Sequence, residues 1–179
     1  GATTLREAIA ITNASSDTER IIVFNPTLVP PGSTISLLTP IEITKPVTIQ
    51  GHAINPLAFH YPGAYGGIEL QSTSGRAFTI TSAAVGQTII ESIVFSACGN
   101  PADDGGAVHL SGSGVQVEFA SCAFDFNDGA RGGAIFNDGA SLKSSACLFV
   151  RNEGIGGAVQ TIGGGTFTAT RTKFVQNES

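Results

Sequence analysis

The chain has 179 residues, of which 41% are hydrophobic and only 13% charged, so it has enough apolar material to form a core as one domain. Its 23 glycines favour a fold with many turns, and its low charged fraction favours one with few charged helical faces. The net charge of −5 argues against a nucleic-acid-binding surface, and no apolar run approaches the ~20 residues that span a bilayer.

Residues 1–20 contain the helical stretch of the chain, and we expect them to form an N-terminal cap. Thr4 and Glu7 have the Thr-x-x-Glu spacing of a capping box, which satisfies free backbone amides at a helix start. One face of this helix then carries Leu5, Ala8, Ile9 and Thr12. An amphipathic helix is well suited to cover the open end of a β-structure, where unpaired strand edges would otherwise associate with other chains.

Residues 21–87 are predicted to be the irregular early part of the β-structure. Short β-rich runs at 21–25, 33–38 and 47–51 are separated by turns rich in proline and glycine.

A loop at 51–67 interrupts the pattern and concentrates aromatic residues and histidine. Its candidates for contact with a partner or a glycan are Phe59, His60, Tyr61 and Tyr65. The alternative, which we favour, is that the loop covers the flank of the fold with its own aromatic side chains.

Residues 88–179 contain a repeat with two independent markers. Gly-Gly-Ala-Val or Gly-Gly-Ala-Ile begins at Gly105, Gly132 and Gly156. A second marker recurs every 25 residues as Phe-x-x-Asn, in the pairs Phe124 and Asn127, Phe149 and Asn152, and Phe174 and Asn177. Phe95 belongs to the preceding period, where Cys98 takes the place of asparagine. A period of this length is typical of a solenoid or an array.

The residues between the markers indicate which solenoid this is. They alternate apolar with small or polar side chains, as in VQVEFASCAF, and no segment has a helical period. Each period of about 25 residues therefore holds about three short strands joined by tight turns, and successive coils pair with one another. We predict an all-β, right-handed parallel β-helix of six or seven coils with a short N-terminal capping α-helix, in a single domain spanning residues 1–179.

Stacking of successive coils predicts columns of side chains. Phe95, Phe124, Phe149 and Phe174 are expected to form an aromatic column, and Asn127, Asn152 and Asn177 to line a turn and bridge coils through their amides. A further inward column contains Val117, Leu142 and Phe167, and another contains Ile93, Cys122, Cys147 and Thr172. We interpret Cys122 and Cys147 as small core residues, since three cysteines without metal-ligand spacing do not indicate a disulfide framework or a metal site.

Two parts of the sequence resemble known families. Residues 4–9, Thr-Leu-Arg-Glu-Ala-Ile, followed by Asn13 and the strand IIVFN, resemble the N-terminal segment of CSLREA-type bacterial surface β-helix proteins, although Thr3 and Thr4 replace the Cys-Ser of that motif. The Gly-Gly-Ala-Ile/Val and Phe-x-x-Asn markers are similar to the repeats of chlamydial polymorphic membrane proteins, which are adhesin-like passengers. Such a resemblance implies a right-handed, secreted or surface-attached solenoid and does not imply an enzyme.

An enzyme is the alternative interpretation, because polysaccharide lyases and hydrolases also use parallel β-helices. The best candidates for acid–base chemistry or cation binding are Asp103 and Asp104, with His109 after the following turn and expected to be exposed. Because Arg131 and Ile155 occupy the corresponding places in the next coils, no column of carboxylates continues. Three arginines spaced by 20 residues, Arg131, Arg151 and Arg171, are expected to be solvated and to pair with Asp125, Asp128 or Glu153.

The sequence thus favours a non-catalytic, extracellular structural or adhesive module of a bacterial surface protein, excised from a longer chain. The alternative is a polysaccharide-acting enzyme or a carbohydrate-binding β-helix. Expected partners are a protein or a glycan at a cell surface, or other copies of the chain. We expect no cofactor, no metal site, no nucleic-acid partner and no membrane-spanning segment.

Overall fold

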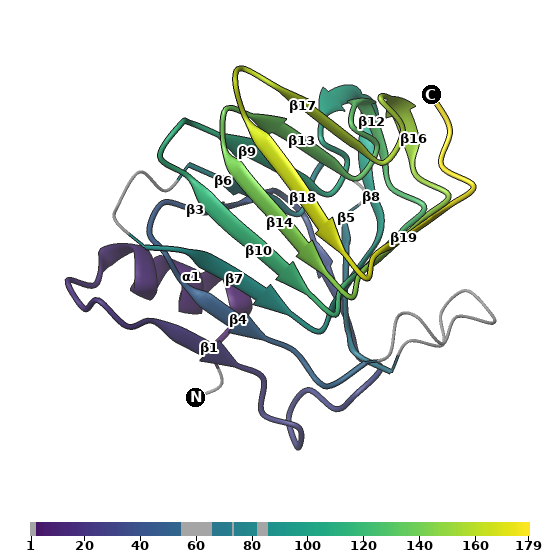
Figure 1. Cartoon of the computed structure of the whole chain (residues 1–179). Coiled ribbons are helices and arrows are strands. Elements are labelled where there is room, and N and C mark those ends of the chain that lie inside the picture. The colour runs from purple at the N-terminus through teal and green to yellow at the C-terminus, as the bar shows by residue number, and fades with distance from the viewer. Residues whose placement is uncertain (1–2, 55–65, 73, 82–85) are drawn as a thin grey trace.

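The protein forms a parallel β-solenoid with one short N-terminal helix (Figure 1). The structure is a computed structural model that describes residues 3–54, 66–72, 74–81 and 86–179. All pairings between the described strands are parallel, as expected when each coil lies in the same direction on the one before it. The fold class predicted from the repeat is confirmed, and its right-handed sense stays a prediction.

Three sheets run along the solenoid. The first has six strands in the order β1 (Ile21–Val23), β4 (Thr48–Gln50), β7 (Thr88–Glu91), β10 (Gln116–Ala120), β14 (Ser141–Ser145) and β18 (Thr166–Thr170). The second has eight strands, β2 (Thr34–Leu37), β5 (Ile68–Ser72), β8 (Ile93–Asp104), β11 (Ala123–Asp125), β12 (Asp128–Arg131), β15 (Leu148–Val150), β16 (Glu153–Ile155) and β19 (Lys173–Val175). The third has five, in the order β3 (Ile41–Ile43), β6 (Phe78–Ile80), β9 (Val108–Ser111), β13 (Ile135–Asp138) and β17 (Val159–Ile162).

The register between coils follows the sequence repeat. Val117 of β10 pairs with Leu142 of β14, which pairs with Phe167 of β18, so the third predicted column is confirmed. Phe95 and Phe124 also pair although they lie 29 positions apart, since their coil has extra residues both within β8 and in the turn between β9 and β10. With six strands in one sheet and five in another, the chain completes about five turns, fewer than the six or seven we expected.

The interior contains the aromatic column predicted from the Phe marker. The rings of Phe95 and Phe124 stack with centroids 4.9 Å apart, those of Phe124 and Phe149 at 4.6 Å, and those of Phe149 and Phe174 at 4.8 Å. Phe95, Phe124 and Phe149 have no exposed surface. Phe124 and Phe149 are therefore each packed between two rings, and the ring spacing matches the distance between neighbouring strands.

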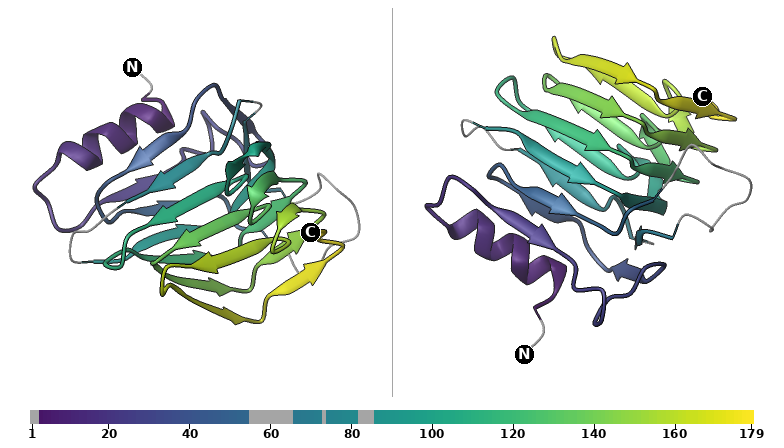
Figure 2. Two further views of the ribbon diagram at one scale, coloured as in Figure 1. Left: turned by 90° about the horizontal axis from the view of Figure 1, so that it is seen from above. Right: turned by 60° about the horizontal axis from the view of Figure 1, so that its bottom comes forward.

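The N-terminal helix α1 (Leu5–Ala14) covers the first coil, as Figure 2 shows. Its capping box is formed, since the Thr4 amide donates to Glu7 Oε2 at 2.8 Å and the Glu7 amide donates to Thr4 Oγ1 at 3.2 Å. Leu5, Ile9 and Thr12 are buried against the end of the solenoid, and Asn13 Nδ2 donates to the Glu42 carbonyl at 2.8 Å. The predicted cap is confirmed.

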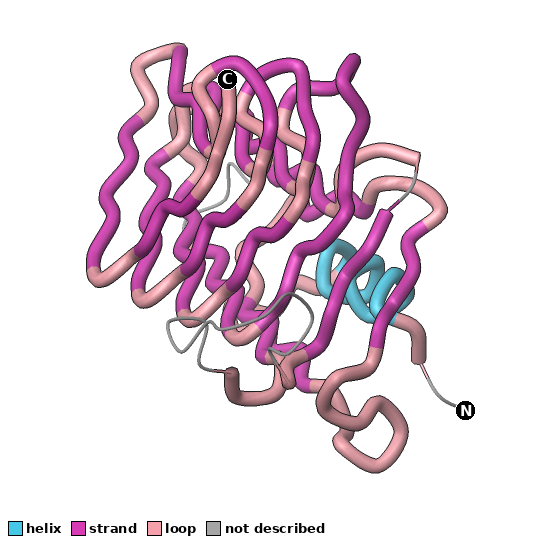
Figure 3. The backbone as a smooth tube through the Cα atoms, turned by 90° about the vertical axis from the view of Figure 1, so that its right-hand side faces the viewer, coloured by secondary structure: helices cyan, strands magenta, loops and turns pink. Residues whose placement is uncertain are grey.

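The corners of the coil contain residues that the sequence did not mark as turns. Two columns of non-glycine residues have positive φ. At the first corner they are Ser92, Ser121, Ala146 and Arg171, and at the second corner they are Ala97, Phe126, Arg151 and Gln176. Such φ values are uncommon outside glycine. They are stabilised here because the corner amides still bond to the next coil, as in the bond from the Phe126 amide to the Val150 carbonyl at 3.2 Å. Figure 3 shows the chain turning at the same places in successive coils.

Candidate functional site

The asparagine column forms a continuous hydrogen-bond ladder inside the second corner. Asn152 is fully buried, and its Oδ1 accepts from Asn127 Nδ2 at 2.8 Å and from the Asn127 amide at 3.1 Å. Its Nδ2 donates to the Phe124 carbonyl at 3.0 Å and to Asn177 Oδ1 at 2.8 Å. The predicted bridging of coils by these amides is confirmed, and the ladder stabilises the residues with positive φ that precede each asparagine.

Cys98 substitutes for asparagine at the start of this ladder. Its amide donates to Asn127 Oδ1 at 3.1 Å, and its Sγ donates to the Leu70 carbonyl at 3.4 Å. The thiol thus makes a weak version of the bond that each asparagine amide makes to the coil below. Burial raises the pKa of the Cys98 thiol to about 12, so this group is not a thiolate at neutral pH.

Cys122, Cys147 and Thr172 make an equivalent ladder at the first corner. The Sγ atoms of Cys122 and Cys147 each donate at 3.3 Å to a carbonyl of the coil below, those of Ile90 and Phe119. The Cys147 amide donates to Thr172 Oγ1 at 3.4 Å. Both cysteines are free and buried, as predicted, and burial raises the pKa of the Cys122 thiol well above its ordinary value.

The predicted acidic pair lies at the end of β8, directly before a tight turn. Gly105 has a φ of +72°, and a Cβ there would approach the Val108 carbonyl oxygen to 2.1 Å. Only glycine is compatible with this turn, which leads into β9. Asp103 and Asp104 therefore lie immediately before a turn that requires glycine.

Asp104 is clamped by an arginine of the next coil. Arg131 pairs with it in register and donates from Nε to Oδ1 at 2.7 Å and from Nη2 to Oδ2 at 2.5 Å. The guanidinium also lies 4.3 Å from the centre of the Phe136 ring. The hydrogen bonds from Arg131 lower the pKa of Asp104, and the same bonds raise the pKa of Arg131.

Asp103 has different partners. It accepts a hydrogen bond from Asn100 Nδ2 at 2.7 Å, and its Oδ1 lies 3.8 Å from Nη2 of Arg76. Arg76 donates from Nη1 to Nδ1 of His109 at 2.7 Å, so this ring nitrogen is unprotonated. His109 is half-buried, which makes our expectation of an exposed side chain wrong. Burial, followed by the charge of Arg76, lowers its pKa.

We call these five side chains, Arg76, Asp103, Asp104, His109 and Arg131, the polar cluster. Each carboxylate has its own arginine, so neither is arranged to share a proton with the other. Asp104 is ionised at neutral pH and its two oxygens are both engaged, which leaves it poorly suited to act as a general base. The arrangement joins three successive coils by charge-assisted bonds.

A second site was missed by sequence reasoning and lies outside the second corner. A cavity of about 400 Å³ is lined there by Phe126, Arg151, Asn152, Glu153, Gln176 and Glu178, and we call it the corner cleft. Arg151 lies on its wall and donates from Nη2 to Asp125 Oδ1 at 2.6 Å, so one of the predicted arginine pairings is confirmed. The signal in the sequence was the pair of residues that flank each ladder asparagine, whose side chains point outward while the asparagine points inward.

Four candidate contact residues of the loop at 51–67 lie outside the described residues, namely Phe59, His60, Tyr61 and Tyr65. Their role stays a prediction. Within the described ranges, no three or more His, Cys, Asp or Glu side chains are placed to hold a metal ion. The described residues also include no helix with the length and apolar character to cross a membrane.

Comparison of the chain with protein families, with curated proteins and with solved structures gives no significant match. The resemblance to CSLREA-type proteins and to polymorphic membrane protein repeats therefore stays a prediction.

Proposed function

We propose that the chain is a non-catalytic structural or adhesive module of a bacterial surface protein. The observation that carries this proposal is the pair of uninterrupted internal ladders. Asparagine amides join the coils at one corner, thiols and a threonine hydroxyl join them at the other, and stacked phenylalanine rings fill the space between. A core built this way makes a stiff rod whose outer faces and turns are available to partners.

The polar cluster supports the non-catalytic part of the proposal. A polysaccharide lyase or hydrolase needs a carboxylate that is free to exchange a proton or to hold a cation. Asp104 is bound through both oxygens to Arg131, and Asp103 is bound to Asn100 next to Arg76. These contacts use the acidic pair to fasten one coil to another.

The two ends of the described solenoid differ in how their strand edges are covered. Phe174 has 47% of its surface exposed, although the rings below it in the column are fully buried, and β18 and β19 have no strand on their outer side among the described residues. At the opposite end, α1 covers the first coil (Figure 2). An exposed strand edge with apolar side chains readily pairs with another β-edge.

Surface location is tested by protease treatment of intact bacteria that express the tagged full-length precursor. We expect the module to be cleaved on intact cells while a cytosolic marker is protected. Protection of the module until the cells are lysed would refute the surface assignment.

The non-catalytic assignment is tested with purified protein on uronate polymers, with release of unsaturated products followed by ultraviolet absorbance. We expect no release. Cleavage by the native chain that disappears in Asp103→Ala or Asp104→Ala would overturn this part of the proposal. Size-exclusion chromatography and negative-stain imaging of the same sample show whether the chains associate.

A further inference from the structure

The corner cleft contains an aromatic ring that the fold does not require. Phe126 has 54% of its surface exposed, whereas Phe95, Phe119, Phe124, Phe136 and Phe149 are all buried. In the coil below, Ala97 has the same corner position and nearly the same backbone, with a φ of +47° against +54° for Phe126. The corner can therefore be built with a methyl group, and the ring at this position is explained by something outside the core.

Part of this ring is covered by an arginine and the rest of it is exposed. The Arg151 guanidinium lies 3.8 Å from the ring centre and is fixed by two hydrogen bonds from Nη2 to the carboxylate of Asp125, at 2.6 and 2.8 Å. Phe126 still has 54% of its surface exposed, and it lines the cleft together with Arg151. A rigid aromatic face beside polar groups is the usual platform for a flat ligand that has both apolar and polar surfaces.

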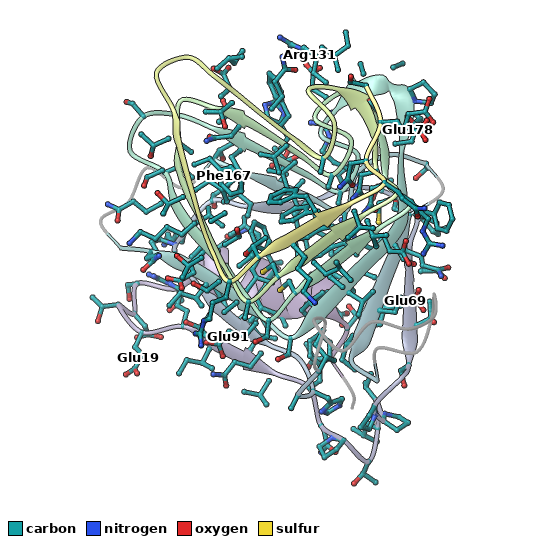
Figure 4. The ribbon with its side chains drawn as sticks, turned by 45° about the vertical axis from the view of Figure 1, so that its right-hand side comes forward. Glu19, Glu69, Glu91, Arg131, Phe167 and Glu178 are labelled. Atoms are coloured by element: carbon teal, nitrogen blue, oxygen red, sulfur yellow. The ribbon has the colours of Figure 1, made fainter. Side chains whose placement is uncertain are left out.

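The rest of the cleft supplies hydrogen-bonding groups. Glu153 and Glu178 pair in register on neighbouring coils, and among the described residues neither carboxylate has a hydrogen-bond or ion-pair partner. Figure 4 shows Glu178 on the outer surface, in contrast to Phe167, which points into the coil. The Gln176 amide adds both a donor and an acceptor to the lining. Carboxylate oxygens are strong acceptors for hydroxyl groups.

Size and charge narrow the class of ligand. A volume of about 400 Å³ lies in the range of small-ligand sites, roughly 300–1,000 Å³, and accommodates one or two sugar rings. The charge of Arg151 is balanced by Asp125, so the two glutamates leave the cleft negative. Sugars that carry carboxylates, such as uronates, would be repelled.

We propose that the corner cleft binds a neutral oligosaccharide, with one sugar ring packed against the exposed part of the Phe126 ring that lines the cleft and its hydroxyl groups donating to Glu153 and Glu178. This site names a ligand class for the adhesive module proposed above, and it rests on that function for its biological setting. Binding is measured on the purified chain, so the two proposals fail separately.

The test begins with the native chain on an array of immobilised oligosaccharides that includes neutral gluco-, manno-, galacto- and xylo-oligosaccharides and oligogalacturonates. The strongest neutral ligand is then titrated by calorimetry. We expect binding to at least one neutral class and none to oligogalacturonates. Phe126→Ala should weaken the binding by about tenfold or more, since the stacked ring supplies much of the contact. Leu28→Ala, which truncates another exposed apolar side chain, is the matched control and should bind as the native chain does.

Circular dichroism of each variant checks that it is folded, and Ala97 indicates that alanine is tolerated at this corner. If Phe126→Ala is unfolded, Phe126→Leu replaces it, because leucine retains apolar bulk and removes the flat face. The proposal is overturned if no neutral oligosaccharide on the array binds, or if the folded Phe126 variant binds as tightly as Leu28→Ala. It is also overturned if oligogalacturonates or a trilysine peptide bind in place of neutral sugars, since these results would assign the cleft to a different ligand chemistry.

Discussion

Removal of one amide from the middle of the asparagine ladder is expected to destabilise the whole solenoid. In Asn152→Ala, four side-chain hydrogen bonds are lost, two that Asn152 accepts from Asn127 and one that it donates to each of Phe124 and Asn177. The site is fully buried, so water cannot replace them easily. The Asn127 amide would lose its bond to the ladder. At about 1 kcal/mol for each bond, the free energy of unfolding should fall by about 4 kcal/mol.

The same substitution at the end of the ladder provides the control. Asn177 is only partly buried, and no further coil lies on it among the described residues. Its amide accepts two bonds from Asn152 and donates one to Phe149, and solvent is close enough to replace part of what is lost. Asn177→Ala should therefore lower the free energy of unfolding by only about 1–2 kcal/mol.

Equilibrium unfolding in urea, followed by far-ultraviolet circular dichroism, measures both variants against the native chain. The slope of the transition must be compared first, because a repeat structure can lose cooperativity when one coil is weakened. If Asn152→Ala and Asn177→Ala destabilise the protein equally, within about 0.5 kcal/mol, burial of the ladder does not determine its contribution and the reasoning fails.

Three further predictions concern the core, the polar cluster and the thiols. Phe149→Ala should lower the free energy of unfolding by about 3–5 kcal/mol in the same urea assay, because it leaves a cavity between the rings of Phe124 and Phe174. A decrease of less than about 1 kcal/mol would contradict the close packing of the phenylalanine column. The folded-state pKa values of His109 and Asp104 are both lowered, so the free energy of unfolding should decrease as pH falls below 6.5, where unfolded histidine takes up a proton, and again below 3.8, where unfolded aspartate does. In urea titrations from pH 8 to 3, the first decrease should vanish in His109→Gln. If it persists in that variant, His109 is not its cause. Cys98, with a pKa of about 12, should react with a disulfide reagent at pH 8 only after unfolding, when all three thiols become reactive; rapid labelling of the native chain would refute its burial.

The solenoid could be predicted because its stacking leaves a periodic record in the chain. Phe124, Phe149 and Phe174 must recur at one spacing if each ring lies on the ring below, and the asparagines keep the same spacing. The coil from Phe95 to Phe124 is longer, and its extra residues lie within β8 and in the turn between β9 and β10, where they do not move the interior column. The fold could be predicted despite this irregularity, because the repeat is carried by the inward-facing positions and does not depend on a constant coil length.

The candidate sites were less predictable because they depend on pairs of residues with no common period. Sequence spacing aligned Arg131 with the acidic pair of the preceding coil, but we expected it to pair with Asp125, Asp128 or Glu153. The structure pairs it with Asp104, because side chains at matching positions of neighbouring coils lie next to each other. The exposure predicted for His109 was wrong because strand alternation places it on the outer face, where Arg76 and Phe136 then cover it. Local periodicity indicates which face a side chain occupies and does not show what lies over that face.

The sequence by itself determined the architecture, since identical side chains can stack only when the chain returns to the same point after each repeat. The tertiary structure alone decided the corners, because Phe126 and Arg151 adopt a left-handed backbone that their own preferences oppose. Bonds between coils, from the corner amides and the buried asparagines, provide the stabilisation. Those corners in turn direct Phe126 and Arg151 outward and create the cleft beside them. Such a cleft arises from contacts between coils, so the residues that flank each asparagine form it only where successive coils are stacked.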